Sequence, residues 1–306
     1  MSVETSVRLG DMTLKTPLLT GSGTFGYGDE FRTVMDYGAF GGIVTKSLSY
    51  EPRPGNLPPR ICETPGGGII NSIGLANPGI DEFMRDKVKV LPVDQTHVFL
   101  SVVGDSVEDF VNVVERLEDV PKVAGYELNV SCPNVKQGGL DIGGDEDAVS
   151  HIVNRVRQLT KRFISVKLTP HHPQIKPLAI AAEEAGADAL TLINTLVGMS
   201  IDLEKRKPLL GNVTGGYSGV PLKPVALAKV WQAAQVVDIP IWASGGMVTG
   251  GDCLEFLVAG ATCLQIGSVL FADPYAPDRI LKEMIDWCEL HEVAAFSDLI
   301  GTLETP

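Results

Sequence analysis

The sequence lacks the features that mark several classes of protein. Its five cysteines, Cys62, Cys132, Cys253, Cys263 and Cys288, are scattered and include no Cys-x-x-Cys pair. This spacing excludes an iron–sulfur cluster or structural zinc site built from this chain alone, and an odd number of separated thiols fits a reducing compartment. No run of about 18 or more apolar residues is present, so no segment is expected to span a bilayer. The first residues lack the basic-then-apolar order of a signal peptide, and we therefore expect a cytoplasmic protein.

Basic residues are also in the minority. The chain has 25 Lys and Arg against 38 Asp and Glu, a net charge of −13 and a pI near 4.8. This balance argues against nucleic acid or an anionic membrane as the main partner. With 306 residues, 44% of them hydrophobic, the chain can bury a full core. We predict one domain over residues 1–306, because α/β barrels of this size usually form a single domain.

Short apolar runs alternate with stretches that have the pattern of amphipathic helices. Strand–helix alternation predicts a parallel sheet, and eight such units predict a closed (β/α)₈ TIM barrel, with an open doubly wound sheet as the alternative. The predicted strands are residues 17–20, 42–46, 98–103, 126–130, 164–168, 189–194, 240–244 and 263–267. The clearest predicted helices are residues 107–117, 146–161, 175–185, 223–236, 251–259 and 278–289. Long insertions at 48–80 and 197–219 follow strands two and six, at the end where barrel enzymes keep their chemistry.

Two predicted strands end in lysine, at Lys46 and Lys167. The period-two alternation of a strand points Ser165 and Lys167 toward the barrel axis. A lysine there needs an anion or a strong acceptor. One explanation is a salt bridge to a barrel carboxylate such as Glu127. Two lysines that converge on one pocket favour a bound anionic or electron-rich ligand.

Polar residues follow several other strands. Cys132 lies in the segment Asn-Val-Ser-Cys-Pro-Asn, between Asn129 and Asn134, and its thiol can act as a base or nucleophile if its pKa is lowered. Asn71 and the pair 194–195, Asn-Thr, lie at other expected strand ends. Single asparagines are usually turn residues. Several of them on one barrel face predict a site for a planar ring rich in N–H and C=O groups, such as a pyrimidine.

Glycine-rich loops follow the last two strands. Residues 244–247, Ser-Gly-Gly-Met, and 267–268, Gly-Ser, occupy the positions where barrels commonly bind a phosphate, although tight turns alone also require glycine. The Gly-x-Gly-x-x-Gly match at 21–26 is interpreted as a flat wall against a ring, because the next strand ends in Lys46 and not in an acidic residue. His171 and His172 have no third ligand at a suitable spacing, so no metal site is predicted.

On these motifs the chain resembles a class 1 dihydroorotate dehydrogenase over essentially its whole length. The matching segments are residues 44–47, 71–75, 129–134, 166–170 and 243–246. Residues 131–139, 202–208 and 212–216 resemble the NAD-linked subclass 1B. One departure is 171–174, His-His-Pro-Gln, where relatives often have Asn-Val-Thr-Asp.

The resemblance implies a TIM barrel that holds FMN and oxidises (S)-dihydroorotate to orotate in de novo pyrimidine (UMP) biosynthesis. It implies that Cys132 is the base that takes the C5 proton and that FMN N5 takes the hydride from C6. Lys46 would lie against flavin and substrate, and Lys167 would donate to the N1/O2 edge of the flavin. Residues 133–144 include four glycines, and we expect this segment to form a lid over the thiol that excludes water during proton removal. A partner subunit with FAD and [2Fe–2S] would pass the electrons to NAD⁺, giving a heterotetramer around a homodimer core.

The residues that the resemblance places at FMN are Ser22, Gly23, Lys46, Ser47, Asn129, Lys167, Ile193, Gly219, Gly245, Gly246, Gly267 and Ser268. Those that it places at the substrate are Lys46, Asn71, Ile73, Gly74, Leu75, Asn129, Asn134, Asn194 and Thr195. Four alternatives stay open: a fumarate-linked class 1A enzyme, a related dihydropyrimidine dehydrogenase, a phosphosugar isomerase or lyase barrel without flavin, and a non-catalytic binding subunit.

Overall fold

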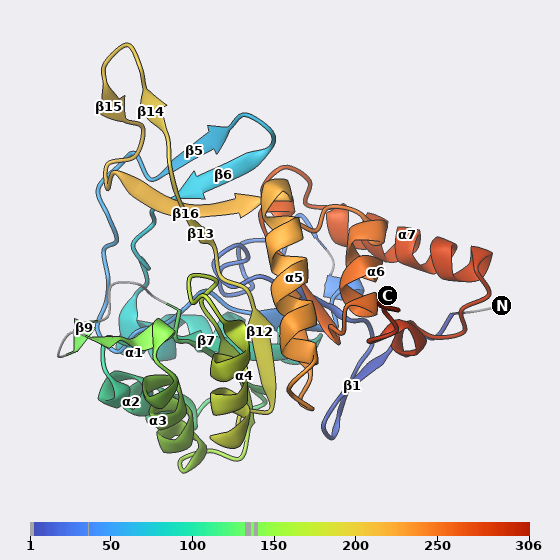
Figure 1. Cartoon of the computed structure of the whole chain (residues 1–306). Coiled ribbons are helices and arrows are strands. Elements are labelled where there is room, and N and C mark those ends of the chain that lie inside the picture. Colours follow the sequence, from blue (N-terminus) through green and yellow to red (C-terminus); the bar gives the residue numbers. More distant parts are fainter. Residues whose placement is uncertain (1–2, 36, 132–135, 138–139) are drawn as a thin grey trace.

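A closed barrel of eight parallel strands forms the centre of the computed structural model, which describes residues 3–35, 37–131, 136–137 and 140–306 (Figure 1). The closed barrel confirms the predicted fold class over an open sheet. Each strand lies within two residues of its predicted bounds. In chain order the barrel strands are β3 (Leu18–Thr20), β4 (Gly42–Val44), β7 (His97–Val102), β8 (Gly125–Asn129), β11 (Phe163–Lys167), β12 (Ala189–Leu192), β17 (Ile241–Ser244) and β18 (Cys263–Ile266).

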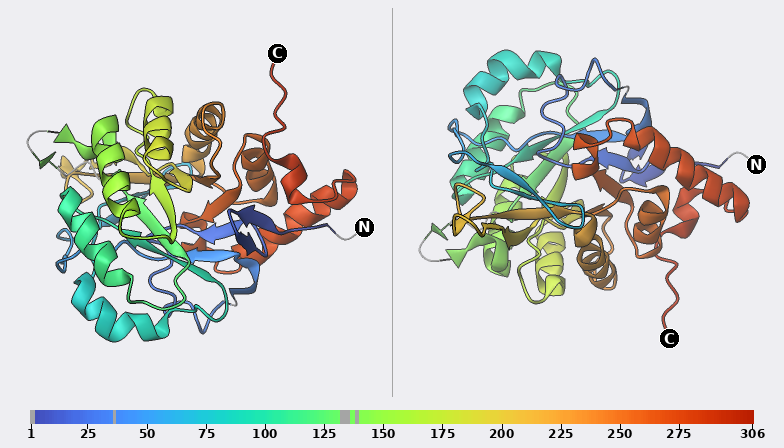
Figure 2. Two further views of the ribbon diagram at one scale, coloured as in Figure 1. Left: turned by 90° about the horizontal axis from the view of Figure 1, so that it is seen from below. Right: turned by 90° about the horizontal axis from the view of Figure 1, so that it is seen from above.

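Helices lie around the outside of these strands (Figure 2). The six predicted helices are α2 (Val107–Leu117), α3 (Glu146–Arg157), α4 (Ile175–Glu184), α5 (Lys223–Ala234), α6 (Gly250–Val258) and α7 (Ala276–Leu290). Two of them begin with a capping box, formed by Ser106 and Asp109 at α2 and by Thr249 and Asp252 at α6. These side chains accept hydrogen bonds from backbone N–H groups that have no partner within the helix, which stabilises the helix start.

Shorter helical segments fill the connections. The turn between the first insertion and β7 contains α1 (Gly79–Glu82), η2 (Phe83–Lys87) and η3 (Val88–Val90), which we did not predict. The others are η1 (Tyr37–Ala39), η4 (Ile142–Gly144), η5 (Val220–Leu222), η6 (Ser268–Phe271) and η7 (Phe296–Leu299). No helix in the described part of the chain is both long and apolar enough to cross a membrane.

The interior of the barrel is layered. Phe99, Phe163 and Trp242 pack together, with the rings of Phe163 and Trp242 stacked at 5.8 Å. The hairpin of β1 (Val7–Leu9) and β2 (Met12–Leu14) packs against this apolar cluster. Two residues further along the strands the layer becomes polar. Its members are Ser101, Glu127, Ser165, Thr191 and Gln265, all buried. Alternation along the strands therefore aims a polar set toward the carboxyl ends of the barrel.

The two long insertions pair with each other at that end. Residues of the first form β5 (Ile61–Thr64) and β6 (Gly68–Asn71), and residues of the second form β13 (Leu196–Met199) and β16 (Thr214–Gly219). Together they make an antiparallel sheet in the order β13-β16-β6-β5, from which the hairpin of β14 (Ile201–Asp202) and β15 (Lys207–Pro208) projects (Figure 1). We predicted the location of the insertions but not their pairing. Within the expected lid, β9 (Lys136–Gln137) pairs with β10 (Leu140–Asp141), and residues 133–135 and 138–139 lie outside the described residues.

Candidate active site

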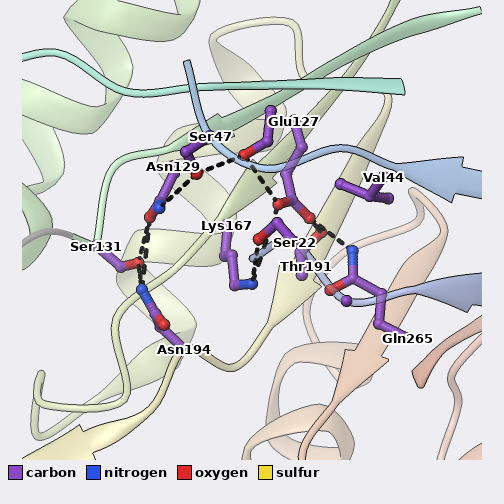
Figure 3. Close-up of polar contacts among 12 residues, drawn as sticks. Ser22, Val44, Ser47, Glu127, Asn129, Ser131, Lys167, Thr191, Asn194 and Gln265 are labelled. Carbon is purple, nitrogen blue, oxygen red and sulfur yellow. Dashed lines mark hydrogen bonds and ion pairs between the residues drawn. The ribbon is translucent and has the colours of Figure 1, made fainter. Parts of the chain in front are cut away.

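A buried carboxylate occupies the polar layer. Glu127 on β8 is fully buried, and its Oε2 accepts hydrogen bonds from Thr191 Oγ1 at 3.0 Å and Gln265 Nε2 at 2.6 Å (Figure 3). Its Oε1 accepts from Ser101 Oγ at 3.4 Å and lies 3.9 Å from Lys167 Nζ. The salt bridge considered from the sequence is therefore present, as a contact longer than a hydrogen bond.

Lys167 joins this carboxylate to the loop after β3. Its side chain is 6% exposed, and its Nζ donates to Ser22 Oγ at 3.0 Å. Ile164 and Val166 pack in the outer hydrophobic cluster, which confirms the predicted inward direction of Lys167. An ammonium group is thus held near the axis, between Glu127 and a residue assigned to the cofactor site.

Strand-end amides meet beside this pair. Asn129 Oδ1 accepts from Ser131 Oγ at 2.8 Å and from Asn194 Nδ2 at 3.5 Å. Asn129 Nδ2 donates to Ser47 Oγ at 3.4 Å, and Ser47 Oγ lies 2.9 Å from Ser101 Oγ. The structure therefore brings together Ser47, Asn129 and Asn194, which come from three different strand ends.

Lys46 follows β4, and its backbone N–H donates to Gly26 O at 2.7 Å. Burial lowers the pKa of Lys46 below its ordinary value; the Glu30 carboxylate opposes this shift and Arg60 adds to it. Within the described residues, its Nζ makes no side-chain hydrogen bond or ion pair. A lysine in this environment is available to a ligand.

The glycine loop after β17 packs closely against the backbone of neighbouring segments. A Cβ on Gly246, whose φ is +78°, would stand 2.7 Å from Lys223 N and 3.0 Å from Gly219 O. Gly245 also has a positive φ, and Ile193 N donates to Ser244 O at 3.0 Å, which ties the ends of β12 and β17. These contacts place two predicted cofactor loops side by side.

The loops after β18 and β3 approach each other in the same way. A Cβ on Gly21 would lie 3.3 Å from Gly267 Cα, and Ser268 begins η6. By contrast, a Cβ on Gly23, whose φ is +88°, would meet nothing within 4 Å. The backbone at Gly23 therefore borders open space.

The predicted substrate loop begins on β6. Asn71 Nδ2 donates to Gly216 O at 3.2 Å, and a Cβ on Gly216 would come within 2.2 Å of Thr195 Oγ1. Asn71 and Thr195 are thus neighbours across β16. Ile73 O accepts from Asn56 N at 3.0 Å, and the next two residues, Gly74 and Leu75, have positive φ angles of 73° and 54°.

Two predicted residues, Cys132 and Asn134, lie outside the described residues. Among the residues that are described, no group of three or more His, Cys, Asp or Glu side chains could hold a metal ion. Sequence reasoning missed Ser101, Ser131, Thr191 and Gln265, all of which contact the site. Three of them, Ser101, Thr191 and Gln265, lie on otherwise apolar strands at positions whose side chains face the barrel axis, and this pattern could have identified them from the sequence.

Comparison with known proteins agrees with the resemblance. A family model described as dihydroorotate dehydrogenase matches residues 4–287. A protein from Pelobacter propionicus is 46% identical, with 99% of this chain and 100% of that protein covered; one from Geobacter sulfurreducens is 48% identical, with 98% of each covered. Both are named dihydroorotate dehydrogenase B (NAD(+)), catalytic subunit.

Among solved structures, a dihydroorotate dehydrogenase from Eimeria tenella in complex with ferulenol matches 98% of this chain and 88% of that chain, with a TM-score of 0.79. Its 22% identity shows the shared fold alone. The family model and the relatives that span the full length go further: the chain belongs to the dihydroorotate dehydrogenase family, class 1B.

Proposed function

We propose that this dihydroorotate dehydrogenase binds FMN at the mouth of its barrel, oxidises (S)-dihydroorotate to orotate for pyrimidine synthesis, and passes the electrons to NAD⁺ through a partner subunit. The observation that carries the proposal is Lys167, a buried ammonium group that contacts Ser22 and Glu127 beside the strand-end amides. A cytoplasmic location, a single domain and a homodimer core belong to the same proposal.

The residues present fit FMN. Gly245 and Gly246 have positive φ angles and no side chains, so no Cβ at these positions shields the backbone N–H groups from a phosphate. Gly23 borders open space, and its neighbour Ser22 accepts from Lys167, so a flat ring can approach the backbone of this loop. In this arrangement Gly245, Gly246, Gly267 and Ser268 would hold the phosphate, and Lys167 would donate to the electron-rich edge of the ring.

The reaction removes a proton and a hydride from adjacent carbons of the substrate. FMN, when bound, supplies the acceptor for the hydride from C6 and its electron pair. The Cys132 thiolate takes the proton from C5, so that the C5–C6 single bond becomes a double bond. Lys46 and the amides of Asn71, Asn129 and Asn194 bind and orient the ring and its carboxylate.

The position next to the proposed base supports its role. Ser131 is 4% exposed, its Oγ donates to Asn129 at 2.8 Å, and it accepts from Asn194. The residue that precedes Cys132 in the sequence is therefore held by two amides assigned to the proposed substrate site.

Substrate choice is tested by mixing the purified chain anaerobically with dihydroorotate or with dihydrouracil. We expect a yellow protein whose flavin absorbance bleaches with dihydroorotate and not with dihydrouracil. Bleaching by dihydrouracil alone would favour the related dihydropyrimidine dehydrogenase. A colourless, folded protein that binds no added FMN would favour a barrel without flavin.

The electron route is tested by copurification from the native host. The names of the relatives, which specify NAD(+) and a catalytic subunit, support a partner. We expect a second subunit that contains FAD and iron, and NAD⁺-dependent turnover of the complex. A chain that purifies alone and turns over with fumarate would favour a class 1A enzyme instead.

A further inference from the structure

Glu127 is a fully buried carboxylate, and the proposed function assigns it no role. Carboxylates are almost never fully buried unless they are paired. Four groups from four other segments face this one: Ser101 on β7, Lys167 on β11, Thr191 on β12 and Gln265 on β18. Three of them donate hydrogen bonds and the fourth is a cation, so the barrel interior is built to hold a negative charge at this point.

The hydrogen bonds that lead from Glu127 to the amides share one direction. An ionised carboxylate only accepts, so Ser101 donates to it, and the hydroxyl proton of Ser47 is then directed at Ser101. Ser47 in turn accepts from Asn129 Nδ2, which leaves Asn129 Oδ1 to accept from Ser131. The series ends at Asn194, whose Nδ2 donates to Ser131 (Figure 3). The Oδ1 of Asn194 accepts from the backbone N–H of Thr195.

We propose that Glu127 is a positioning residue that holds and partly neutralises the Lys167 ammonium and sets the direction of the hydrogen bonds that orient Asn129 and Asn194. The consequence for the flavin rests on the proposed function, in which Lys167 lies against the ring. A cation beside the ring favours its electron-rich reduced form, and a carboxylate behind that cation weakens the effect. Glu127 therefore lowers the reduction potential of the flavin by acting through Lys167.

The structure offers a substitution that removes the charge with little change in shape. In Glu127→Gln, the new amide nitrogen can take the place of Oε2 and face Gln265 and Thr191. Gln265 Oε1 is buried without a hydrogen-bond partner, so a flip of the Gln265 amide would let it accept. Thr191 Oγ1 can likewise accept and donate to Ser165 Oγ, 2.9 Å away. The remaining oxygen still accepts from Ser101, so the direction of the series is kept.

The first test measures the coupling between Glu127 and Lys167 by urea unfolding of the FMN-free chain. We expect Glu127→Gln and Lys167→Met each to lower the urea midpoint, and the double variant to lose clearly less than the two single losses added together, because each single variant leaves one buried charge without its partner. The matched control is Thr191→Val, which removes a hydrogen bond to Glu127 but no charge, so its loss should add to that of Lys167→Met with a smaller departure from additivity. Additive losses for Glu127→Gln and Lys167→Met would overturn the proposal.

The second test measures the midpoint potential of bound FMN. We expect Glu127→Gln to make two-electron reduction about tenfold more favourable, a shift of about +30 mV. In a Lys167→Met background the same substitution should shift the potential much less, because the cation that Glu127 holds and partly neutralises is absent. Equal shifts in the two backgrounds would show that Glu127 does not act through Lys167 and would overturn the proposal.

The two tests separate this inference from the proposed function. If wild type binds no FMN, or its flavin is not bleached by dihydroorotate, the proposed function fails, while urea unfolding of the FMN-free chain still decides whether Glu127 holds Lys167. If Glu127→Gln does not fold, Glu127→Asp replaces it, because it keeps the charge but withdraws it from Lys167. We then expect a smaller but measurable departure from additivity with Lys167→Met, and full additivity would overturn the proposal.

Discussion

Ser131 Oγ donates to Asn129 Oδ1 at 2.8 Å, so a buried hydroxyl ties the residue before Cys132 to the last residue of β8. The same hydroxyl accepts from Asn194 at the end of β12. The ends of β8 and β12 therefore hold the Ser131 side chain, and Cys132, the proposed base, is the next residue in the sequence.

Cys132→Ala should slow the reduction of FMN by dihydroorotate by about 10²–10⁴-fold, because the proton on C5 loses its acceptor. The measurement is anaerobic stopped-flow absorbance of the flavin, with FMN content expected to stay at the wild-type value. Cys62→Ala is the matched control, since this thiol lies on β5, is assigned to neither the substrate nor the FMN site, and should leave the rate unchanged. Reduction of Cys132→Ala at near wild-type speed would remove the base assignment.

The rate of flavin reduction in wild type should rise with pH through the apparent pKa of the Cys132 thiol and then level off. The thiolate is the base, so the active fraction grows as the proton is lost. Single-turnover rates measured across pH 5–10 give the profile. A rate that does not depend on pH, or that falls as pH rises, would mean that a different group accepts the proton.

Lys167→Met should lower the free energy of unfolding by about 3 kcal/mol, because it leaves Glu127 buried without its cation. We expect the low end of the range for broken buried pairs, since Thr191 and Gln265 still donate to the carboxylate. Urea unfolding of the FMN-free protein measures the loss, and adding Glu127→Gln should recover part of it. FMN retention should also fall. A variant with unchanged stability and unchanged FMN content contradicts both roles of Lys167.

Gly246→Ala should lower the free energy of unfolding by about 1–3 kcal/mol, because its φ of +78° and the 2.7 Å approach to Lys223 N both exclude a Cβ. FMN affinity should fall with it if this loop holds the phosphate. Gly251→Ala in α6 is the control: its Cβ would meet only Thr249 Oγ1 at 3.8 Å. That variant should keep FMN affinity and gain up to about 1 kcal/mol. Equal FMN affinity in the two variants would mean that the loop at Gly246 does not bind the phosphate.

Lys46→Met should stabilise the FMN-free protein while it slows turnover. Burial lowers the pKa of Lys46 in the folded state, so the protonated form is favoured on unfolding. Above the unfolded pKa of about 10.4, Lys46 is neutral in both states and costs the folded protein no stability. As pH falls from there through the pKa of Lys46 in the folded state, the free energy of unfolding decreases. The advantage of Lys46→Met should therefore be largest at neutral pH and vanish above about pH 10.4. Urea midpoints at pH 7 and pH 10.5 measure it, and a variant less stable than wild type at pH 7 contradicts the argument.

The barrel was predictable because its signal is local. The strand that ends in Lys167 has side chains that alternate between Val166, which packs outward, and Ser165 and Lys167, which face the axis. This alternation repeats on each of the eight strands, and helix starts such as Ser106 are equally local. The candidate ion pair of Lys167 with Glu127 could be named from the sequence. The 3.9 Å distance between Lys167 Nζ and Glu127 Oε1, and the three hydrogen-bond donors that also face Glu127, could not.

The sequence by itself determined the order of strands and helices, the inward direction of Lys167 and the end of the barrel where the polar residues gather, because side-chain period and strand direction follow from neighbouring residues. Only the tertiary structure decided that β6 pairs with β16, so that Asn71 meets Gly216, 145 positions away in the chain. It also decided that Glu127 anchors the hydrogen bonds that reach Asn194. Contacts of this kind depend on how distant segments close on one another, and no local pattern encodes which of several compatible partners each will meet.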